Sequence, residues 1–235
     1  MLTRRFLLGS SLSAAAAILC TNSTQAKALS KPAAGAVFYV ANDCRLGREK
    51  AFHLWYQTQH LDETLGIPGT LSGRRYARVS PASAPNYLTV YDLQSADVFS
   101  STAFRRRLAD KTPMTDENLR LSMVQMQAGV LDVVWSDGHG TGIFLDIFRL
   151  RDGSDVVNKL KSSVDSLWLT SDAIAFEQAR CLKRKNEAGL NEYLLAVQWA
   201  DIAEWPIPDL GQRLKGIGLM SPAETGSRFR LLTAR

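Results

Sequence analysis

Two of the chain's three histidines lie in one stretch, "FHLWYQTQHLDETLGIPG", from Phe52 to Gly69. On a helix, Tyr56 and His60 are separated by four residues and share a face. A neutral imidazole, with an ordinary pKa of about 6.5, accepts a proton at physiological pH. A tyrosine hydroxyl beside it can stabilise a developing enolate oxygen. The pair predicts a base and its helper, as an isomerase, cyclase or lyase needs to remove a proton next to a carbonyl.

The same helix supplies two further candidate substrate contacts, Trp55 and His53. Its polar positions border its apolar ones: His53, Tyr56, Gln57, His60 and Thr64 lie beside Ala51, Leu54, Thr58, Leu61 and Leu65. Polar groups at the edge of a buried face suit the wall of a pocket. For His53 a structural role, with a hydrogen bond near the helix start, is favoured over a functional one. Asp62 and Glu63 are expected to be solvated.

An arginine-rich strand follows this helix in the segment "SGRRYARVS", from Ser72 to Ser80. Alternation along a strand places Arg74, Tyr76 and Arg78 on one face and Arg75 on the other. Because arginine binds carboxylates through two parallel hydrogen bonds, these residues predict contacts to an anionic substrate. A charged edge strand that prevents aggregation is the alternative. The later "FRRRL", residues 104–108, is expected to be a solvated helix face.

Several chemistries find no support in the sequence. His53 and His60 are about 10.5 Å apart along a helix at ~1.5 Å per residue, so joint metal binding is not expected. One histidine would still suffice to hold non-covalent haem. Motifs of serine hydrolases, nucleotide-binding loops and zinc peptidases are absent. His139 is expected to be exposed and inert.

The first 28 residues read as an export signal with Arg4, Arg5, an apolar run and a small-residue site ending at Ala28. It is of the twin-arginine type and predicts a periplasmic or secreted protein. A lipoprotein at Cys20 is less favoured because Leu19 is bulky, and an uncleaved anchor is a further alternative. Without these residues, Lys+Arg falls from 28 to 25 against 23 Asp+Glu, a net charge of +2. Such a small charge gives no reason to expect nucleic acid or membrane partners.

The sequence also repeats itself. "VFYV" at 37–40 matches "IFLD" at 143–146, and "YLTVYDLQSAD" from Tyr87 matches "YLLAVQWADIA" from Tyr193, both at an offset of 106 residues. "YARVS" from Tyr76 matches "QARCL" from Gln178 at an offset of 102. The order predicts two units, 29–138 and a degenerate 139–235, joined by a flexible "SDGHGTG" at 136–142. Whether Cys44 and Cys181 form a disulfide stays open.

Hydrophobic periodicity predicts β-α-β-β-α-β in each unit. The first comprises strands at 37–40, 71–80, 87–93 and 129–135, with helices near 51–65, 96–108 and 115–126. The second comprises strands at 142–149, 173–183, 193–199 and 228–233, with helices at 155–168 and 202–217. This is an α+β fold of tandem ferredoxin-like units. Each unit leaves one sheet face bare, so the two are expected to pack sheet to sheet.

The segments "FHLWYQTQHLDE" and "IPGTLSGRRY" resemble the dimeric α/β-barrel superfamily, and its EthD-like branch in particular, over residues 37–92. Asp62 departs from the branch, which tends to have proline two residues after the histidine. The resemblance implies a barrel of two sheets with ligand pockets between a sheet and its helices. Activities in the superfamily include cofactor-free oxygenases, lactone isomerases, cyclases, dehydratases and haem enzymes.

The leading hypothesis is an exported, cofactor-independent enzyme acting on a small apolar or aromatic carbonyl or carboxylate compound. His60 is its base and Tyr56 its helper. The alternatives are a non-catalytic small-molecule-binding protein and a haem-binding or oxygenase protein. The chain is expected to be a monomer or homodimer with one ligand site, in the first unit.

Overall fold

The structure is a computed structural model that describes residues 33–138, 140, 142–151, 153, 155–167, 176–200 and 208–235. The predicted export signal and His139 lie outside the described residues. No helix within the described ranges is long and apolar enough to span a membrane. Cys44 and Cys181 are both free thiols.

The first half of the chain has the predicted order of elements. Its strands are β1 (Ala36–Cys44), β2 (Thr70–Ser80), β3 (Tyr87–Leu93) and β4 (Met123–Gly138). The first helix has three segments: α1 (Glu49–Trp55), a π-helical turn η1 (Tyr56–His60) and α2 (Leu61–Leu65). The second helical region comprises α3 (Asp97–Ser100), α4 (Thr102–Ala109) and α5 (Pro113–Leu121).

The second half repeats the plan. Its strands are β5 (Phe144–Leu150), β6 (Phe176–Lys185), β7 (Asn191–Trp199) and β8 (Ser227–Ala234), and its helices are α6 (Val156–Leu167) and α7 (Pro208–Gly216). The strands close into one antiparallel barrel in the order β1-β3-β2-β8-β5-β7-β6-β4. Each half contributes four consecutive strands, and the halves meet where β2 pairs with β8 and β4 with β6. The predicted α+β fold of tandem ferredoxin-like units is confirmed.

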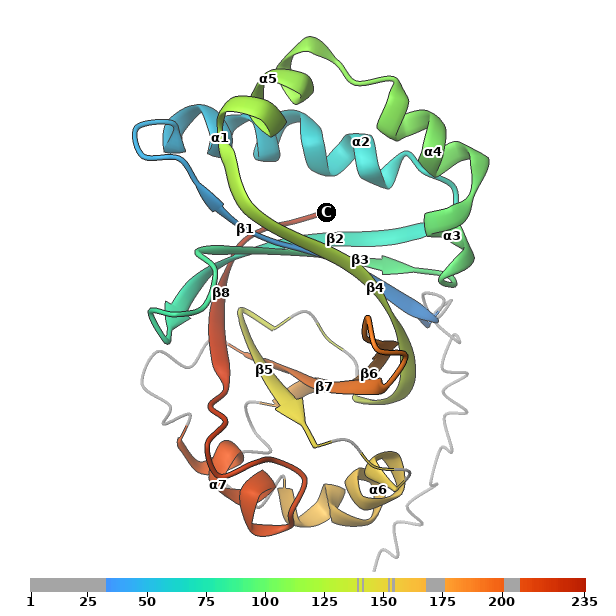
Figure 1. The fold of residues 1–235 in the computed structure, drawn as a ribbon, viewed down its shortest axis with the longest axis vertical. Coiled ribbons are helices and arrows are strands. Elements are labelled where there is room, and N and C mark those ends of the chain that lie inside the picture. Colours follow the sequence, from blue (N-terminus) through green and yellow to red (C-terminus); the bar gives the residue numbers. More distant parts are fainter. Residues whose placement is uncertain are drawn as a thin grey trace, which may run out of the picture. The chain divides into compact units, whose positions relative to one another are not determined.

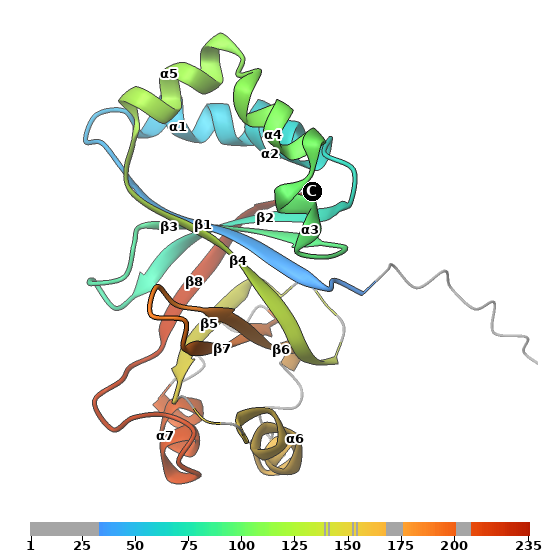
Figure 2. The same cartoon turned by 45° about the vertical axis from the view of Figure 1, so that its right-hand side comes forward.

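Helices cover the barrel on two opposite sides (Figure 1, and Figure 2 from a second angle). Side chains of each strand therefore alternate between the barrel interior and a helical layer. In β1, Val37 packs in the interior cluster and Ala36 and Val40 in the cluster beneath the first helices. A third cluster lies beneath α6 and α7. The fold thus offers three separate interiors: a lumen between the sheets and two helix–sheet layers.

Two predicted boundaries need correction at β4. The helix expected over 115–126 ends at Leu121, and the strand starts at Met123. The first three residues of the expected flexible linker belong to β4, because Ser136, Asp137 and Gly138 pair with Arg180, Ala179 and Gln178. The physical reason is closure of the barrel: β4 pairs with β1 and then with β6, so it must be long enough to belong to both sheets.

Candidate functional site

The predicted catalytic pair lies in the π-helical turn of the first helix. Here the Leu61 N–H donates to the Tyr56 carbonyl, five residues back. The wider turn buries the consecutive residues Trp55 and Tyr56 completely, whereas Leu54, expected in the core, is 54% exposed. The larger aromatic side chains gain more from burial and occupy the face that the simple apolar stripe had assigned to Leu54. Such π turns are frequent at functional sites.

Tyr56 and His60 are in contact. Their ring centroids are 4.8 Å apart with the rings nearly perpendicular at 86°. The indole of Trp55 lies 4.2 Å from the imidazole of His60 at 30° and donates from Nε1 to Thr115 Oγ1 at 2.9 Å. Burial lowers the pKa of His60, so its imidazole is neutral at physiological pH. Burial likewise raises the pKa of Tyr56, whose hydroxyl keeps its proton.

A partly buried carboxylate lies beside this pair. Glu63 Oε2 lies 3.6 Å from His60 Nδ1, longer than a hydrogen bond, while Gln59 and Thr115 donate to Glu63 at 2.6 and 2.8 Å. Arg107 forms an ion pair with the same carboxylate. Burial alone would raise the pKa of Glu63, but these donors and the Arg107 charge lower it to about 2. The expectation that Glu63 is solvated was wrong, because α4 and α5 fold over it. Asp62 is 59% exposed on its side chain, as expected.

Arg75, on β2, points into the same layer and is completely buried. Its guanidinium carbon lies over three aromatic rings, at 4.2 Å from the centroid of Tyr56, 4.7 Å from Tyr87 and 4.9 Å from Phe52. No carboxylate of the described residues forms an ion pair with it. Cation–π contacts stabilise a desolvated guanidinium by about 2 kcal/mol, much less than the cost of burying a charge. The cation is therefore only partly compensated.

His53 connects Arg75 to Tyr87. Arg75 Nη1 lies 2.9 Å from His53 Nδ1, and Tyr87 Oη lies 3.2 Å from His53 Nε2. Because a guanidinium only donates, Nδ1 must be the acceptor, and the hydrogen of the neutral ring sits on Nε2. Burial and the charge of Arg75 lower the pKa of His53, consistent with this tautomer. The structural role that the sequence suggested for His53 thus involves β2 rather than the helix start.

Unsatisfied polar atoms concentrate in this helix–sheet layer. Among the buried side-chain atoms of the described residues without a hydrogen bond of full geometry are six around Arg75: Tyr56 Oη, His60 Nδ1, Arg75 Nε, Arg75 Nη2, Thr89 Oγ1 and Tyr91 Oη. Native interiors leave few such groups, and a cluster of them marks a place for water, an ion or a ligand. We call this cluster, with Trp55, His53 and Glu63, the helix–sheet site.

The other predicted arginine-strand residues lie elsewhere. Tyr76 packs in the lumen cluster, and Arg74 donates to Asp92 Oδ2 at 2.5 Å in the same buried network as Arg180. Arg78 donates to the carbonyls of Ala82 and Ala84 in the β2–β3 turn. The predicted alternation of the strand is confirmed, and it separates Arg74, Tyr76 and Arg78 from His60. Only Arg75 of the four is brought to the helix–sheet site.

The second half contains a comparable buried arginine with a different partner. Arg228 Nε and Nη2 each donate to one oxygen of Asp146, both at 2.7 Å, and Trp199 Nε1 donates to the same carboxylate at 2.9 Å. Asp146 and Arg228 are 1% and 5% exposed. Trp199 places this ion pair in the layer beneath α6 and α7. Here the protein itself supplies the carboxylate that Arg75 lacks.

Sequence reasoning missed four contributors to the site. Glu63 and Arg107 were assigned to solvated surfaces, although the spacing of Arg107 from buried Phe104 allowed it to turn inward. Tyr87 and Tyr91 were read only as strand residues. Their alternation on β3 was the available signal, since Tyr87, Thr89 and Tyr91 share a face. Among the described residues no cluster of histidine, cysteine and carboxylate side chains suits a metal ion.

Comparison with known proteins supports the fold and not a specific relative. No protein-family model matches the chain, and no curated protein matches its sequence. A "Putative monooxygenase" from Fusobacterium nucleatum is similar in structure, with a TM-score of 0.56, 9% identity and coverage of 86% of this chain and 94% of that one. An anthrone oxidase-like protein is similar with a TM-score of 0.53 and 11% identity, and the match covers 85% of this chain and 92% of that one. A "Putative Chlorite dismutase" is similar with a TM-score of 0.54 and 9% identity, and the match covers 84% of this chain and 94% of that one. The chain therefore has the ferredoxin-like, dimeric α+β barrel fold.

Proposed function

We propose that this chain is an enzyme that removes a proton next to a carbonyl in a small aromatic or apolar compound carrying a carboxylate. The reaction is placed in the helix–sheet site. The observation that carries the proposal is Arg75: a completely buried cation, beside Tyr56 and His60, with two donors unpartnered. An anionic ligand supplies the charge and the acceptors that the described residues do not.

The geometry of the free donors favours a carboxylate. Nε and Nη2 form one edge of the planar guanidinium, and Nη1 is already bonded to His53. That edge matches the two oxygens of a carboxylate. Arg228 uses the same two nitrogens to bind Asp146 at 2.7 and 2.7 Å. Arg75 is thus the substrate anchor, and the aromatic rings of Phe52 and Tyr56 suit an apolar or aromatic body next to it.

His60 is the base. The Glu63 carboxylate near Nδ1 favours the tautomer with hydrogen on Nδ1, which leaves the lone pair on Nε2. The proton moves from the substrate carbon to this nitrogen, and the electron pair moves onto the carbonyl oxygen. Tyr56 then stabilises that oxygen through its buried, protonated hydroxyl, whose side-chain neighbour among the described residues is Thr89. The step needs no cofactor. The enolate either takes the proton back from His60 at a different atom or reacts with dioxygen, and the names of the monooxygenase and anthrone oxidase-like neighbours support the second outcome.

Deuterium exchange tests this proposal. The protein is incubated in D₂O with phenylpyruvate, which has an acidic carbon beside a keto group and a carboxylate, and with neutral phenylacetone. We expect accelerated exchange of phenylpyruvate, loss of at least 100-fold in His60→Gln, and a preference for phenylpyruvate that disappears in Arg75→Met. Oxygen uptake in the same mixtures separates oxidation from isomerisation. Equal exchange in the parent and His60→Gln contradicts the assignment of the base, and no exchange at all favours the non-catalytic binding protein.

Haem is the rival occupant of this site, and of the two described histidines only His60 keeps a ring nitrogen, Nε2, that could bind iron. Both ring nitrogens of His53 are hydrogen-bonded within the protein, and the ring of His60 lies against Trp55 with Nδ1 toward Glu63. We expect no Soret band beyond that of free haemin on titration. A stoichiometric band that disappears in His60→Gln would show that the haem alternative is correct.

A further inference from the structure

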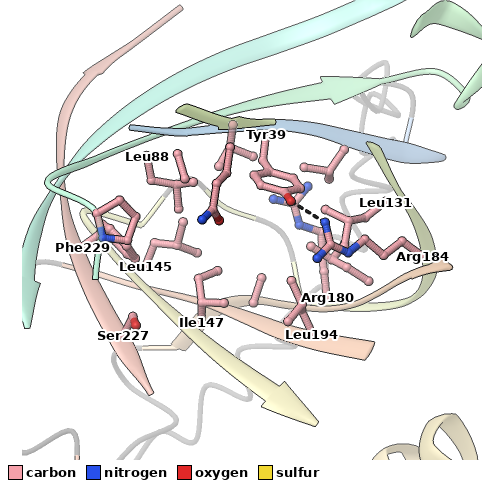
Figure 3. Close-up of a pocket in the computed structure, with 17 residues that line it drawn as sticks. Tyr39, Leu88, Leu131, Leu145, Ile147, Arg180, Arg184, Leu194, Ser227 and Phe229 are labelled. Atoms are coloured by element: carbon pink, nitrogen blue, oxygen red, sulfur yellow. Dashed lines mark hydrogen bonds between the residues drawn. The ribbon is translucent and has the colours of Figure 1, made fainter. Parts of the chain in front are cut away.

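The barrel lumen contains a cavity that is separate from the helix–sheet site. Its volume is about 250 Å³, close to the lower end of the range for small-molecule sites, ~300 Å³. Every strand except β2 contributes to its wall (Figure 3). Most of the wall is aliphatic or aromatic, with Leu88, Leu131, Leu145, Ile147, Leu194 and Phe229 as its main apolar members. A cavity of this character suits an apolar chain or ring.

One group of polar side chains gives the cavity a charge. Arg180 and Arg184 of β6 project into it beside Tyr39 of β1, and Arg184 Nη1 donates to Tyr39 Oη (Figure 3). Since Tyr39 accepts this hydrogen bond, its own hydroxyl hydrogen is left to donate. Arg184 is otherwise held by Glu192 at 2.7 Å. The hydroxyl of Tyr39 is therefore positioned by the protein and offers a donor at the cavity wall.

Arg180 belongs to a buried network with an excess of positive charge. Asp92 accepts from Arg74 at 2.5 Å and from Arg180 Nη1 at 2.5 Å, so one carboxylate serves two guanidinium groups. Arg74 and Arg180 are each 4% exposed. Burial would raise the pKa of Asp92, but the two arginines lower it to about 2, and the network carries one net positive charge at neutral pH. An anion in the lumen would balance that charge.

We propose that the lumen is a second binding site, for an apolar molecule with a single anionic head group, such as a medium-chain carboxylate. The head group lies against Arg180 and the Tyr39 hydroxyl. The apolar body lies among the leucines and Ile147, where it removes hydrocarbon surface from water. The site is formed by both halves of the chain, whereas the helix–sheet site is formed by the first half alone.

Calorimetry with decanoate and decanol tests the proposal on the full chain. We expect one decanoate per chain and binding at least tenfold weaker for decanol, which lacks the charge. Tyr39→Phe removes only a hydroxyl and should weaken decanoate binding several-fold. Ala196→Leu adds volume at the cavity wall and should abolish it. Ile147→Phe serves the same purpose if Ala196→Leu does not fold.

Arg75→Met is the matched control, because it removes the anion anchor of the other site and leaves the lumen unchanged. Decanoate should bind this variant as tightly as the parent. In the parent, nuclear Overhauser contacts from the decanoate chain to labelled methyls of Leu131 and Leu145 should appear. Loss of binding in Arg75→Met, undiminished binding in Ala196→Leu, or no binding of decanoate to the parent would each overturn the proposal.

Discussion

At the scale of single residues, Arg75 and Arg228 form an informative pair. Both are buried arginines in a layer between a sheet and its helices, yet one has aromatic rings and a neutral histidine around it and the other a bidentate carboxylate. The free energy of a buried charge depends on its compensation, so the two should respond oppositely to the same substitution.

Arg75→Met should leave the free energy of unfolding within about 1 kcal/mol of the parent, or raise it, because an incompletely compensated cation is replaced by an apolar side chain of similar length. Arg228→Met should lower it by about 3–5 kcal/mol, because Asp146 would remain buried without its cation. Urea unfolding of both variants measures this. A loss of several kcal/mol in Arg75→Met would mean that the guanidinium is structural.

The two histidines of the first helix predict how stability depends on pH. Burial lowers the pKa of His53 and of His60 below the ordinary 6.5. The unfolded chain therefore binds protons at a higher pH than the folded protein does. The stability that these neutral rings contribute should be complete above about pH 7 and should be lost as the pH falls through 6.5 and below, because protonation then favours the unfolded chain. Thermal unfolding from pH 7.5 to 5.5 should show this slope, and the double variant His53→Gln, His60→Gln should flatten it.

At the scale of elements, one carboxylate links the first helix to both α4 and α5. Glu63 of α2 contacts Arg107 of α4 and Thr115 of α5, and Trp55 donates to the same threonine. The arrangement positions the indole against His60. The position of the indole therefore depends on the Glu63 carboxylate, although the sequence alone predicts an ordinary surface residue there.

Glu63→Gln should lower the free energy of unfolding by about 1–2 kcal/mol at neutral pH, because the partly buried Arg107 loses its ion pair. Asp62→Asn is the matched neighbour, exposed by 59%, and should stay within about 0.5 kcal/mol of the parent. In the parent, the contribution of Glu63 is present above pH 4.5 and is lost as pH falls towards about 2. Acid unfolding curves of both variants measure it. Equal stabilities of the two at pH 7 would contradict this role of Glu63.

Element order and strand alternation could be predicted from the sequence, and the site could be predicted only in part. The placement of Tyr56, His60 and Arg75 follows from periodicities of single elements, which are local properties. The π turn, the inward turn of Glu63 and Arg107, and the extension of β4 depend on contacts between distant segments. Leu54 shows the limit plainly: its apolar type fits the core stripe, but Trp55 and Tyr56 compete for the same burial.

At the scale of the whole described barrel, each half lacks a closed sheet of its own. β2 and β4 complete their pairing only with β8 and β6 of the other half. Residues 29–138 alone would expose two strand edges and the lumen-facing side chains of Val37, Leu88 and Leu131.

We therefore expect a fragment of residues 29–138 to lack a stable monomeric fold and to dimerise or aggregate. The intact chain should unfold in one cooperative transition. Calorimetry and sedimentation of both proteins test this. A monomeric fragment with a sharp thermal transition would contradict the prediction.

The continuous ring of hydrogen-bonded strands also limits how a ligand reaches the lumen. The described strands form a closed barrel without a free edge, so a ligand enters and leaves the lumen through the two ends of the barrel. Side chains at these ends form the barrier. Rearrangement of such side chains is fast compared with the parting of paired strands. A short ligand should exchange quickly. A ligand wider than the ends of the barrel would be enclosed when the strands pair during folding. We expect native mass spectrometry of protein purified from cells to show such an enclosed ligand, and we expect brief unfolding and refolding to release it.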